Sequence, residues 1–389
     1  MRVISVVGAR PNFMKIAPFI RAVEKYNREH DNYIDHILVH TGQHYDIRMS
    51  EAFFRALEIP EPCLNLEIGS GTHAEQLGHT MIEFEKVLRW EYPDWVVVVG
   101  DVNATLSCSV VAKKFNVKLC HIEAGLRSGD MTMPEEINRL VTDRLSDLLF
   151  TPDLISSENL RKEGVPEEKI FFAGNIMIDT LESNRIKAEN LSVDKIISDN
   201  LIEGRKHSVD FSGNGDYALM TLHRPSNVDD EDVFFPLIKF LSEEVTKNFP
   251  LIWAVHPRAR KQLEKNGWWD YVMSNPALII LEPVGYHEML RLNMGARLML
   301  TDSGGLQEEC TVLGTPCITL RYNTERPVTL REHGGLSVLT GNNLERIREE
   351  FLNALDIKRK PVRPELWDGH AAERIVEKLV EFDRRPEPR

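Results

Sequence analysis

The sequence predicts an α/β protein made of two doubly wound, Rossmann-like parallel sheets. Its 389 residues exceed what one ordinary hydrophobic core accommodates, so two domains are expected. Short apolar runs alternate with amphipathic stretches, and continuous apolar strands are typical of parallel sheets covered on both faces. Two strand–turn–helix segments, one ending near Lys15 and one ending near Glu309, give each half a turn suited to binding an anion.

The first half begins with the apolar run Val3–Val7 and continues with runs of similar length. These runs predict strands because they are short, apolar and bounded by turn-forming residues. The expected strands are 2–7, 34–40, 95–99, 117–122, 147–150 and 169–173. Amphipathic patterns between them predict helices at 15–27, 73–91, 103–115, 134–146 and 154–163.

The second half repeats this alternation and ends in a helix, 370–383, that we expect to return to the first domain. The strands are expected at 217–222, 251–255, 278–281, 297–300, 315–319 and 336–338, with helices near 230–247, 286–294, 304–313 and 343–354. The pattern therefore predicts an N-terminal domain of residues 1–177, joined by the C-terminal segment 366–389, and a C-terminal domain of residues 178–365.

The composition narrows the possible functions. A hydrophobic content of 42% and a charged content of 28% are those of a soluble globular protein, and a net charge of −13 argues against binding to nucleic acid or to an anionic membrane. The five cysteines are scattered and never spaced C-x-x-C, which disfavours a disulfide framework and a structural zinc site. We expect a cytoplasmic protein that acts on a small molecule.

The first anion-type turn, Gly8–Lys15, follows the first predicted strand. Free backbone N–H groups at the start of a helix, together with the helix dipole, favour a bound anion there. Arg10 and Lys15 flank this turn, and both could face a diphosphate. The ordinary alternative is that Gly8 only makes a tight turn and that Arg10 is solvated.

The second anion-type turn, Thr301–Glu309, follows the strand predicted at 297–300. Ser303 is placed to cap the following helix, and Gly304 and Gly305 would let a ligand approach the backbone closely. The two turns belong to different domains, which suggests a ligand held between both.

Acidic residues follow neighbouring strands of the first half, at the edge where parallel sheets bind ligands. Asp101 follows the strand 95–99, Glu123 follows the next strand, and Glu135 lies in the first turn of a helix. Structural alternatives exist for each: Asp101 as a helix cap, Glu123 in an ion pair with Arg127 or Arg139, and Glu135 as a helix-start acid. Their combination favours general acid and base chemistry.

Histidines end the first two strands of the second half, at His223 and His256. The sequence contains no His-Glu-x-x-His pattern, so no metal site is expected. It also lacks G-x-G-x-x-G, a Walker loop and G-x-S-x-G, so neither a nicotinamide cofactor nor a serine nucleophile is expected.

Motifs along nearly the whole chain point to one family. They are Gly8-Ala9-Arg10-Pro11 with Lys15, His40–Tyr45, Gly100-Asp101, His121–Arg127, Pro134–Arg139, Gly174-Asn175, Thr221–Arg224, Asp302–Glu309 and Thr324–Pro327. In this order and combination they resemble the non-hydrolysing UDP-N-acetylglucosamine 2-epimerases. The resemblance implies the GT-B architecture, in which two Rossmann-like domains face a deep cleft.

The resemblance also implies an activity. Members convert UDP-N-acetylglucosamine reversibly to UDP-N-acetylmannosamine, a precursor of cell-surface polysaccharide, and relatives act on modified UDP-2-acetamido sugars. The C2 proton is barely acidic, so the family eliminates UDP across C1–C2 to give a 2-acetamidoglucal, and UDP adds back after protonation on the opposite face. The resemblance implies no cofactor, and a homodimer.

Site roles carry over by similarity of motif. Asp101, Glu123 and Glu135 would form the carboxylate set, with the acid and the base left unassigned, and His223 would help UDP depart. The other matches would bind the UDP-sugar, with Glu309 on the ribose hydroxyls: Arg10, Lys15, His256, Ser303, Gly304, Gly305, Glu309 and Arg326.

Three alternatives stay open: a hydrolysing epimerase that releases free N-acetylmannosamine and UDP, a GT-B glycosyltransferase, and a non-catalytic sugar-nucleotide sensor. Many bacterial members carry His-Arg-Arg-Glu-Asn where this chain has His223–Asn227, with Pro225 in place of the second arginine. We therefore expect no allosteric activation by substrate. The short loop 128–133 is similar to that of relatives acting on modified UDP-sugars, so the exact sugar is open.

Overall fold

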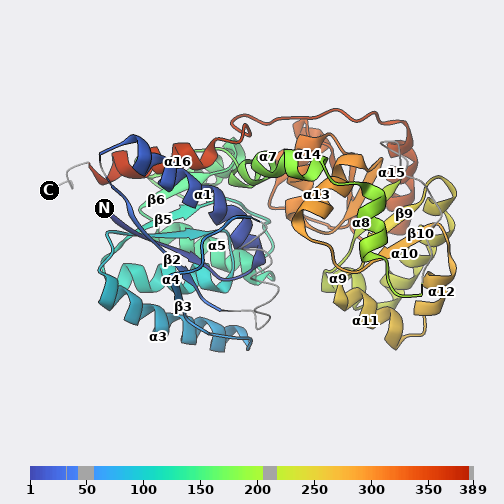
Figure 1. Ribbon diagram of the computed structural model, residues 1–389, viewed down its shortest axis with the longest axis horizontal. Coiled ribbons are helices and arrows are strands. Elements are labelled where there is room, and N and C mark those ends of the chain that lie inside the picture. Colours follow the sequence, from blue (N-terminus) through green and yellow to red (C-terminus); the bar gives the residue numbers. More distant parts are fainter. Residues whose placement is uncertain (32, 43–56, 205–216, 385–389) are drawn as a thin grey trace. The chain divides into compact units, whose positions relative to one another are not determined.

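The computed structural model describes residues 1–31, 33–42, 57–204 and 217–384, with the side chains of residues 10 and 11 outside the description. It divides the chain into two compact units (Figure 1). Unit 1 comprises Met1–Ser183 and Pro364–Arg389, and unit 2 comprises Asn184–Arg363. Each unit has its own parallel sheet with helices on both faces.

Unit 1 contains a seven-stranded sheet in the order β3-β2-β1-β4-β5-β6-β7, and all of its ladders are parallel. Its strands are β1 (Arg2–Val7), β2 (Asp35–His40), β3 (Leu64–Asn65), β4 (Trp95–Val99), β5 (Lys118–Ile122), β6 (Leu148–Thr151) and β7 (Ile170–Phe172). The strand order reverses between β1 and β4. Doubly wound sheets bind ligands outside the carboxyl ends of the strands at such a reversal.

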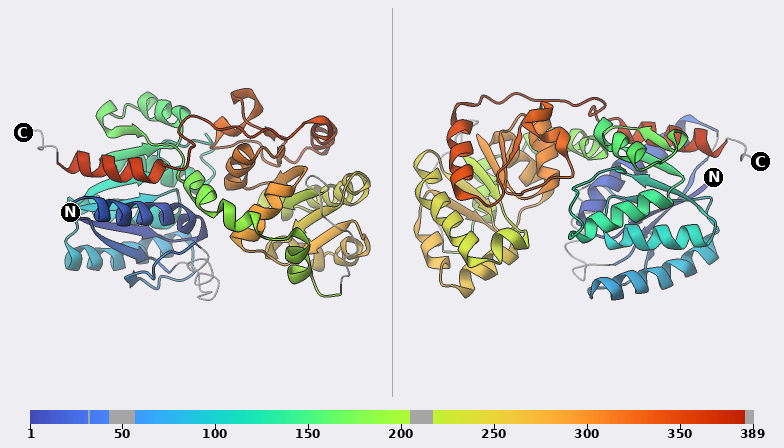
Figure 2. Two further views of the ribbon diagram at one scale, coloured as in Figure 1. Left: turned by 45° about the horizontal axis from the view of Figure 1, so that its top comes forward. Right: turned by 180° about the vertical axis from the view of Figure 1, so that it is seen from behind.

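Helices cover both faces of this sheet. On one face, α1 (Arg10–Glu29) and α16 (Ala371–Asp383) lie side by side, although they come from opposite ends of the chain (Figures 1 and 2). On the other face, α3 (His73–Glu91) and α4 (Asn103–Lys114) pack apolar side chains such as Phe84 onto the sheet. The remaining helices of this part are α5 (Pro134–Leu145), α6 (Leu154–Lys162) and α7 (Ile176–Glu189), which runs into unit 2.

Unit 2 contains a six-stranded parallel sheet in the order β10-β9-β8-β11-β12-β13, with its reversal between β8 and β11. Its strands are β8 (Ala218–Thr221), β9 (Leu251–Ala254), β10 (Leu278–Leu281), β11 (Leu298–Thr301), β12 (Cys317–Thr319) and β13 (Ser337–Leu339). Successive strand residues alternate between faces. Trp253 therefore packs with one helix layer and Ile252 with the other.

The helices of unit 2 form these two layers. Their bounds are α8 (Val193–Asn200), α9 (Pro225–Val228), α10 (Glu231–Glu243), α11 (Pro257–Lys265), α12 (Trp269–Ser274), α13 (Tyr286–Gly295), α14 (Gly304–Leu313) and α15 (Leu344–Asp356). Side chains of α10, α11 and α15 join the core on one face, and those of α8, α13 and α14 join the core on the other. Among the described residues, no helix combines the length and the apolar character that crossing a membrane requires.

The predicted class, two doubly wound parallel sheets, is confirmed. The start of α1 differs: it begins at Arg10 rather than at residue 15. Proline is tolerated in the first turn of a helix, and the Asn12 Oδ1 accepts hydrogen bonds from the backbone N–H groups of Gly8 and Ala9 at 3.1 and 3.2 Å. The turn therefore closes within the segment that the sequence analysis treated as a loop.

Candidate active site

The reversal of strand order in unit 1 brings Lys15, Asp101 and Glu123 to one edge of the sheet. Lys15 lies in α1 after β1, Asp101 follows β4, and Glu123 follows β5. Because β1, β4 and β5 are neighbours and parallel, their carboxyl ends meet at this edge. Residues distant in the sequence are therefore assembled by the topology of the sheet itself.

Lys15 and Glu123 form a buried ion pair between Nζ and Oε2. Their side chains are only 6% and 2% exposed. Glu123 has a left-handed backbone, with φ of 74°, and its N–H donates to the carbonyl oxygen of Phe150 at 3.1 Å. Such a backbone is uncommon for a residue other than glycine, and it occurs disproportionately at functional sites. The position of this carboxylate is thus set by the backbone and by its counter-ion.

Asp101 is held by Arg139 on α5. The Asp101 Oδ2 accepts from the Arg139 Nη2 at 2.6 Å and from its Nε at 3.0 Å. Asn138, on the same helix, donates to the Asp101 carbonyl oxygen at 2.8 Å. Arg139 is buried and also pairs with Glu136, whereas the Asp101 side chain is 22% exposed. Asp101 therefore presents a carboxylate at the surface of unit 1 against a buried cation.

The two adjacent acids at the start of α5 have different surroundings. Glu135, the predicted third carboxylate, is exposed. Glu136 is buried, and it accepts hydrogen bonds from the Ser128 and Gly129 backbones at 3.1 and 2.9 Å. Burial alone would raise the pKa of Glu136, but these hydrogen bonds and Arg139 outweigh it and hold the pKa below its ordinary value. Glu136 therefore anchors the loop after β5, and Glu135 is the acid accessible to a ligand.

A second buried network supports the end of β4. The His121 Nε2 lies 2.9 Å from the Gly100 carbonyl oxygen, and its Nδ1 lies 2.6 Å from Asp143 Oδ1. Each ring nitrogen of His121 therefore faces an oxygen atom. Burial opposes ionisation of Asp143, but the charges and hydrogen bonds of His121 and Arg127 dominate and lower its pKa. This network fixes the turn that carries Gly100.

In unit 2, the reversal of strand order brings His223 and Asp302 together. His223 follows β8 and Asp302 follows β11, and these strands are neighbours. The His223 Nδ1 lies 2.7 Å from the Asp302 Oδ1, and the backbone N–H of Arg224 donates to the Oδ2 at 2.8 Å. Burial would raise the pKa of Asp302, but the His223 contact and the backbone donors lower it.

This contact determines which ring nitrogen of His223 can contact a ligand. An ionised Asp302 accepts the proton on Nδ1, so the Nε2 of His223 is the nitrogen available to a ligand. The His223 side chain is 42% exposed, and its ring lies 5.7 Å from the ring of His256. His256 is exposed and accepts a hydrogen bond on Nδ1 from the Arg258 backbone at 3.1 Å. The sequence-predicted histidines of this unit thus lie together.

The start of α14 is the anion-type turn predicted in unit 2. Ser303 occupies the N-cap position, but its side chain makes no capping hydrogen bond, so its hydroxyl is not committed to the helix. A methyl group at Gly304 would lie 2.7 Å from the Arg326 Nη1, so glycine permits that guanidinium to approach the helix start. Gly305 follows in the first turn. The predicted anion-binding residues Ser303, Gly304, Gly305 and Arg326 are therefore brought together.

Arg326 and Glu309 are both buried beneath this helix start. The Arg326 Nε lies 2.9 Å from the Glu308 Oε1, and its Nη1 also pairs with Glu325. Burial, together with the neighbouring charge of Glu308, raises the pKa of Glu309 to about 8. Glu309 is therefore predominantly protonated at neutral pH and holds both a donor and an acceptor.

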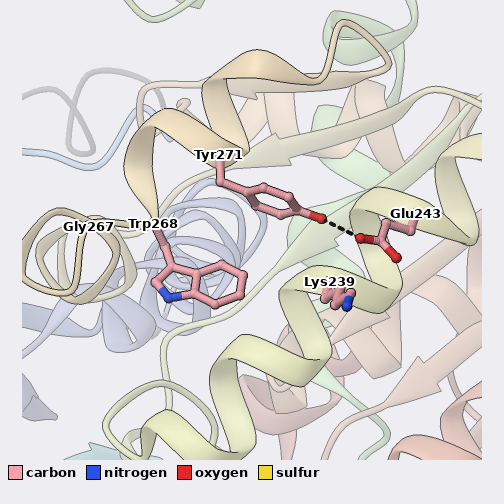
Figure 3. Close-up of a pocket in the computed structure, with 5 residues that line it drawn as sticks. All are labelled: Lys239, Glu243, Gly267, Trp268 and Tyr271. Carbon is pink, nitrogen blue, oxygen red and sulfur yellow. Dashed lines mark hydrogen bonds between the residues drawn. The ribbon is translucent and has the colours of Figure 1, made fainter.

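Three further points complete the description of the site. Arg10 is the first residue of α1, and its side chain lies outside the described part of the structure. Among the described residues, no group of three or more His, Cys, Asp or Glu could hold a metal ion. A hollow of about 300 Å³ in unit 2 contains none of the predicted site residues (Figure 3); Lys239, Glu243, Gly267, Trp268 and Tyr271 line it.

Comparison with known proteins gives this geometry a family. A sequence model of the family described as UDP-N-acetylglucosamine 2-epimerase matches residues 27–380. The UDP-N-acetylglucosamine 2-epimerase of Methanocaldococcus jannaschii is 42% identical over 382 residues, which cover 98% of this chain and 99% of that protein. The chain belongs to the UDP-N-acetylglucosamine 2-epimerase family.

One further relative and one protein of similar fold complete the comparison. The UDP-2,3-diacetamido-2,3-dideoxy-D-glucuronate 2-epimerase of Pseudomonas aeruginosa is 35% identical over 386 residues, which cover 98% of this chain and all of that protein. A lipopolysaccharide outer core galactosyltransferase is 12% identical, with a TM-score of 0.50 and 98% of each chain covered. The latter shows the fold alone, and it places the chain in the GT-B class as predicted.

The M. jannaschii enzyme has also been crystallised with UDP-N-acetylglucosamine and UDP. That structure matches this chain with a TM-score of 0.86, at 42% identity, and covers 98% of this chain and all of that chain. The family prediction made from the motifs is therefore confirmed.

The sequence pattern indicated the candidate site residues but not the residues that form ion pairs and hydrogen bonds with them. Arg139, Glu136 and Asp302 lie inside the quoted motifs and Asp143 lies outside them, yet none of the four was predicted as a site residue. Each acts by contacting a residue 3 to 79 positions away. The available signal was charge. A motif that carries both an acid and a cation contains a possible ion-pair partner for a catalytic candidate.

Proposed function

We propose that this protein catalyses the reversible 2-epimerisation of UDP-N-acetylglucosamine to UDP-N-acetylmannosamine, or of a close UDP-2-acetamido sugar. The observation that carries the proposal is the pair of carboxylates Asp101 and Glu123. Each follows a neighbouring strand, and each is held by a buried cation in a chain of this family. Two carboxyl groups at one sheet edge suit a reaction that removes a proton from one face of C2 and returns one to the other.

The steps balance without a cofactor. A carboxylate takes the C2 proton as the bond from C1 to the diphosphate oxygen breaks, which leaves a C1–C2 double bond and UDP. A proton is then delivered to the opposite face of C2 and UDP adds back to C1. Asp101, Glu123 and Glu135 supply the candidate acids and bases. The Nε2 of His223 would stabilise the charge that develops on the departing UDP.

The substrate-binding residues divide by chemistry. Arg10, Ser303, Gly304, Gly305 and Arg326 would contact phosphate oxygens, because a helix start and a guanidinium both favour an anion. Glu309 would contact the ribose hydroxyls, for which its protonated carboxyl group offers a donor and an acceptor. His256 would lie beside the diphosphate with His223.

Deuterium exchange tests the proposal directly. We expect the protein to incorporate solvent deuterium at C2 of UDP-N-acetylglucosamine in D₂O and to produce a second anomeric signal by NMR. Asp101→Asn and Glu123→Gln should each reduce exchange at least ~100-fold while UDP still binds. A panel that includes UDP-2,3-diacetamido-glucuronate belongs in the same experiment, because the P. aeruginosa relative is named for that sugar. No exchange with any member of the panel would refute the proposal.

The same spectra separate the alternatives. Free N-acetylmannosamine and UDP would identify a hydrolysing epimerase, in which water intercepts the intermediate. UDP binding with no exchange at C2 would identify a sensor. Sugar transfer only in the presence of an acceptor would identify a glycosyltransferase.

We also propose that the enzyme is a cytoplasmic homodimer and supplies precursors for cell-surface polysaccharide. All five cysteines are free thiols, which suits a reducing compartment. Ile82 on α3 and Ile137 and Val141 on α5 are exposed, and apolar side chains at a surface favour association. Light scattering coupled to size-exclusion chromatography measures the oligomeric state.

A further inference from the structure

Lys15 was expected to bind the diphosphate, but its ammonium group is committed to a different partner. The side chain is buried, and its Nζ pairs with the Glu123 carboxylate. We propose that Lys15 is a positioning residue for Glu123: it holds this carboxylate in the orientation needed for proton transfer at C2, and it does not serve as a phosphate ligand. This inference rests on the proposed function, in which Glu123 is one of the acids and bases.

Burial of both groups is the first support. The pair has side-chain exposures of 6% and 2%, so neither charge has water as an alternative partner. A buried ion pair contributes little to net stability, but removal of one partner is strongly destabilising because the other group stays in a poorly solvated place. The orientation of the Glu123 carboxylate thus depends on Lys15.

The second support is the way in which the surrounding backbone leaves room for the pair. A methyl group at Gly100 would lie 2.9 Å from the Lys15 Nζ and 3.3 Å from the Glu123 Oε2. Gly100 also has a left-handed backbone, with φ of 66°, and its carbonyl oxygen is fixed by His121. The glycine that ends β4 therefore permits both the turn and the ion pair.

The third support is the rigid placement of α1. Asn12, which is one turn before Lys15, donates from Nδ2 to the Val99 carbonyl oxygen at 2.8 Å and accepts from the backbone of Gly8 and Ala9. The first turn of α1 is thus fastened to the end of β4, beside Gly100. Lys15 is presented to Glu123 from an anchored helix rather than from a mobile loop.

Lys15→Met separates this role from phosphate binding. We expect kcat for exchange at C2 to fall at least ~100-fold, while the Kd for UDP and the KM change less than ~3-fold. Lys15→Arg keeps the charge and should recover part of kcat. Lys25→Met is the matched control, since Lys25 lies on the same helix and pairs with Glu373 at the surface at 2.9 Å.

A double-mutant cycle gives the second readout. If Lys15 acts through Glu123, then Lys15→Met costs nothing further in kcat in the Glu123→Gln background. The double variant carries neither charge, so it should fold even where Lys15→Met alone is unstable. The thermal unfolding of the four proteins should show a coupling between the two positions.

The opposite outcome is equally clear. A loss of UDP affinity of ~10-fold or more, equal in both backgrounds, would assign Lys15 to the diphosphate and overturn the inference. UDP affinity and unfolding require no turnover, so they decide the role of Lys15 even if the wild-type protein fails to exchange C2 and the proposed function is refuted.

Discussion

Among the proposed UDP-binding residues, Glu309 has the protonation state that the fold changes most clearly. It lies in α14, is 3% exposed and follows Glu308, whose carboxylate pairs with Arg326. Burial and that neighbouring charge raise its pKa to about 8 from an ordinary value of 4.5. A protonated carboxyl group can donate one hydrogen bond to a ribose hydroxyl and accept another. A carboxylate in the same place could only accept hydrogen bonds.

This shift predicts a pH-dependent cost to folding. Between about pH 4.5 and 8 the unfolded chain releases the Glu309 proton and the folded protein retains it, so stability falls as pH rises through this window. Glu309→Gln removes the titration. The variant should therefore gain stability relative to the wild type between pH 5 and 8, by on the order of a few kcal/mol. Urea unfolding at both pH values measures this difference, and parallel pH dependences in the two proteins would contradict it.

At the scale of single residues, the sequence identified the candidate site residues better than it identified their ion-pair partners. Asp101, Glu123 and His223 lie at strand ends, which hydrophobic periodicity locates well. Their partners depend on tertiary packing: Glu123 pairs with Lys15, 108 positions away, whereas Arg127 pairs with Asp143 and Glu163. The sequence analysis offered Arg127 or Arg139 as the partner of Glu123, because both cations lie in the motifs that follow the same strand.

At the scale of elements, the pattern of apolar runs located strands closely. β1, β4 and β10 begin and end where periodicity placed them, because buried parallel strands are continuous apolar runs. The helix α7 was missed, and in it polar and apolar residues are interspersed. The helices α8 and α11 were also missed, although each buries one apolar face. The two-residue β3 was also missed, since so short a strand leaves no periodic signal.

The helix α16 depends on an acid that is distant in the sequence. Asp179, on α7, accepts from the backbone N–H groups of Ala371 and Ala372 at 3.1 and 2.7 Å, while the N-cap residue His370 makes no side-chain cap. These are donors that the helix itself cannot satisfy. A capping carboxylate therefore joins two elements of unit 1.

Asp179→Ala should destabilise the protein by about 1–2 kcal/mol and increase amide exchange in the first turn of α16. Asp179→Asn retains an acceptor and should lose less. Burial raises the pKa of Asp179 to about 6, so the comparison belongs at about pH 8, where the wild-type side chain is ionised. Equal stability of the Ala and Asn variants would show that the two hydrogen bonds do not secure the helix.

At the scale of the whole molecule, the two sheets are independent cores joined by two chain segments. Among the described residues, the buried members of the two hydrophobic clusters of unit 2 lie between Val193 and Ala354. Unit 1, in contrast, needs both ends of the chain, because α16 packs beside α1 and closes one face of its sheet (Figure 2). The sequence analysis expected the last helix to return to the first domain, but it could not show which helix it would contact there.

This asymmetry predicts the behaviour of fragments. Residues 184–363 retain all of their sheet, and the bond from His287 to Asn184 at 2.8 Å is preserved, so this fragment should unfold cooperatively in urea. Because it carries His223, Ser303 and Glu309, it should also bind UDP, although without any exchange at C2. Calorimetry with UDP measures the binding, and Glu309→Gln in the fragment is the control.

Residues 1–183 should behave differently. Without α16 they lose the hydrogen bond from the Trp95 Nε1 to Asp383 at 2.9 Å, the ion pair from Lys118 to the same carboxylate, and the apolar cover over α1. This fragment should bind hydrophobic dyes and lack a cooperative transition, because a large apolar surface is exposed. Addition of a peptide of residues 364–389 should restore the transition by binding only the folded form. If the fragment 1–183 unfolds cooperatively alone and the peptide does not change its transition, then α16 is not part of the core of unit 1.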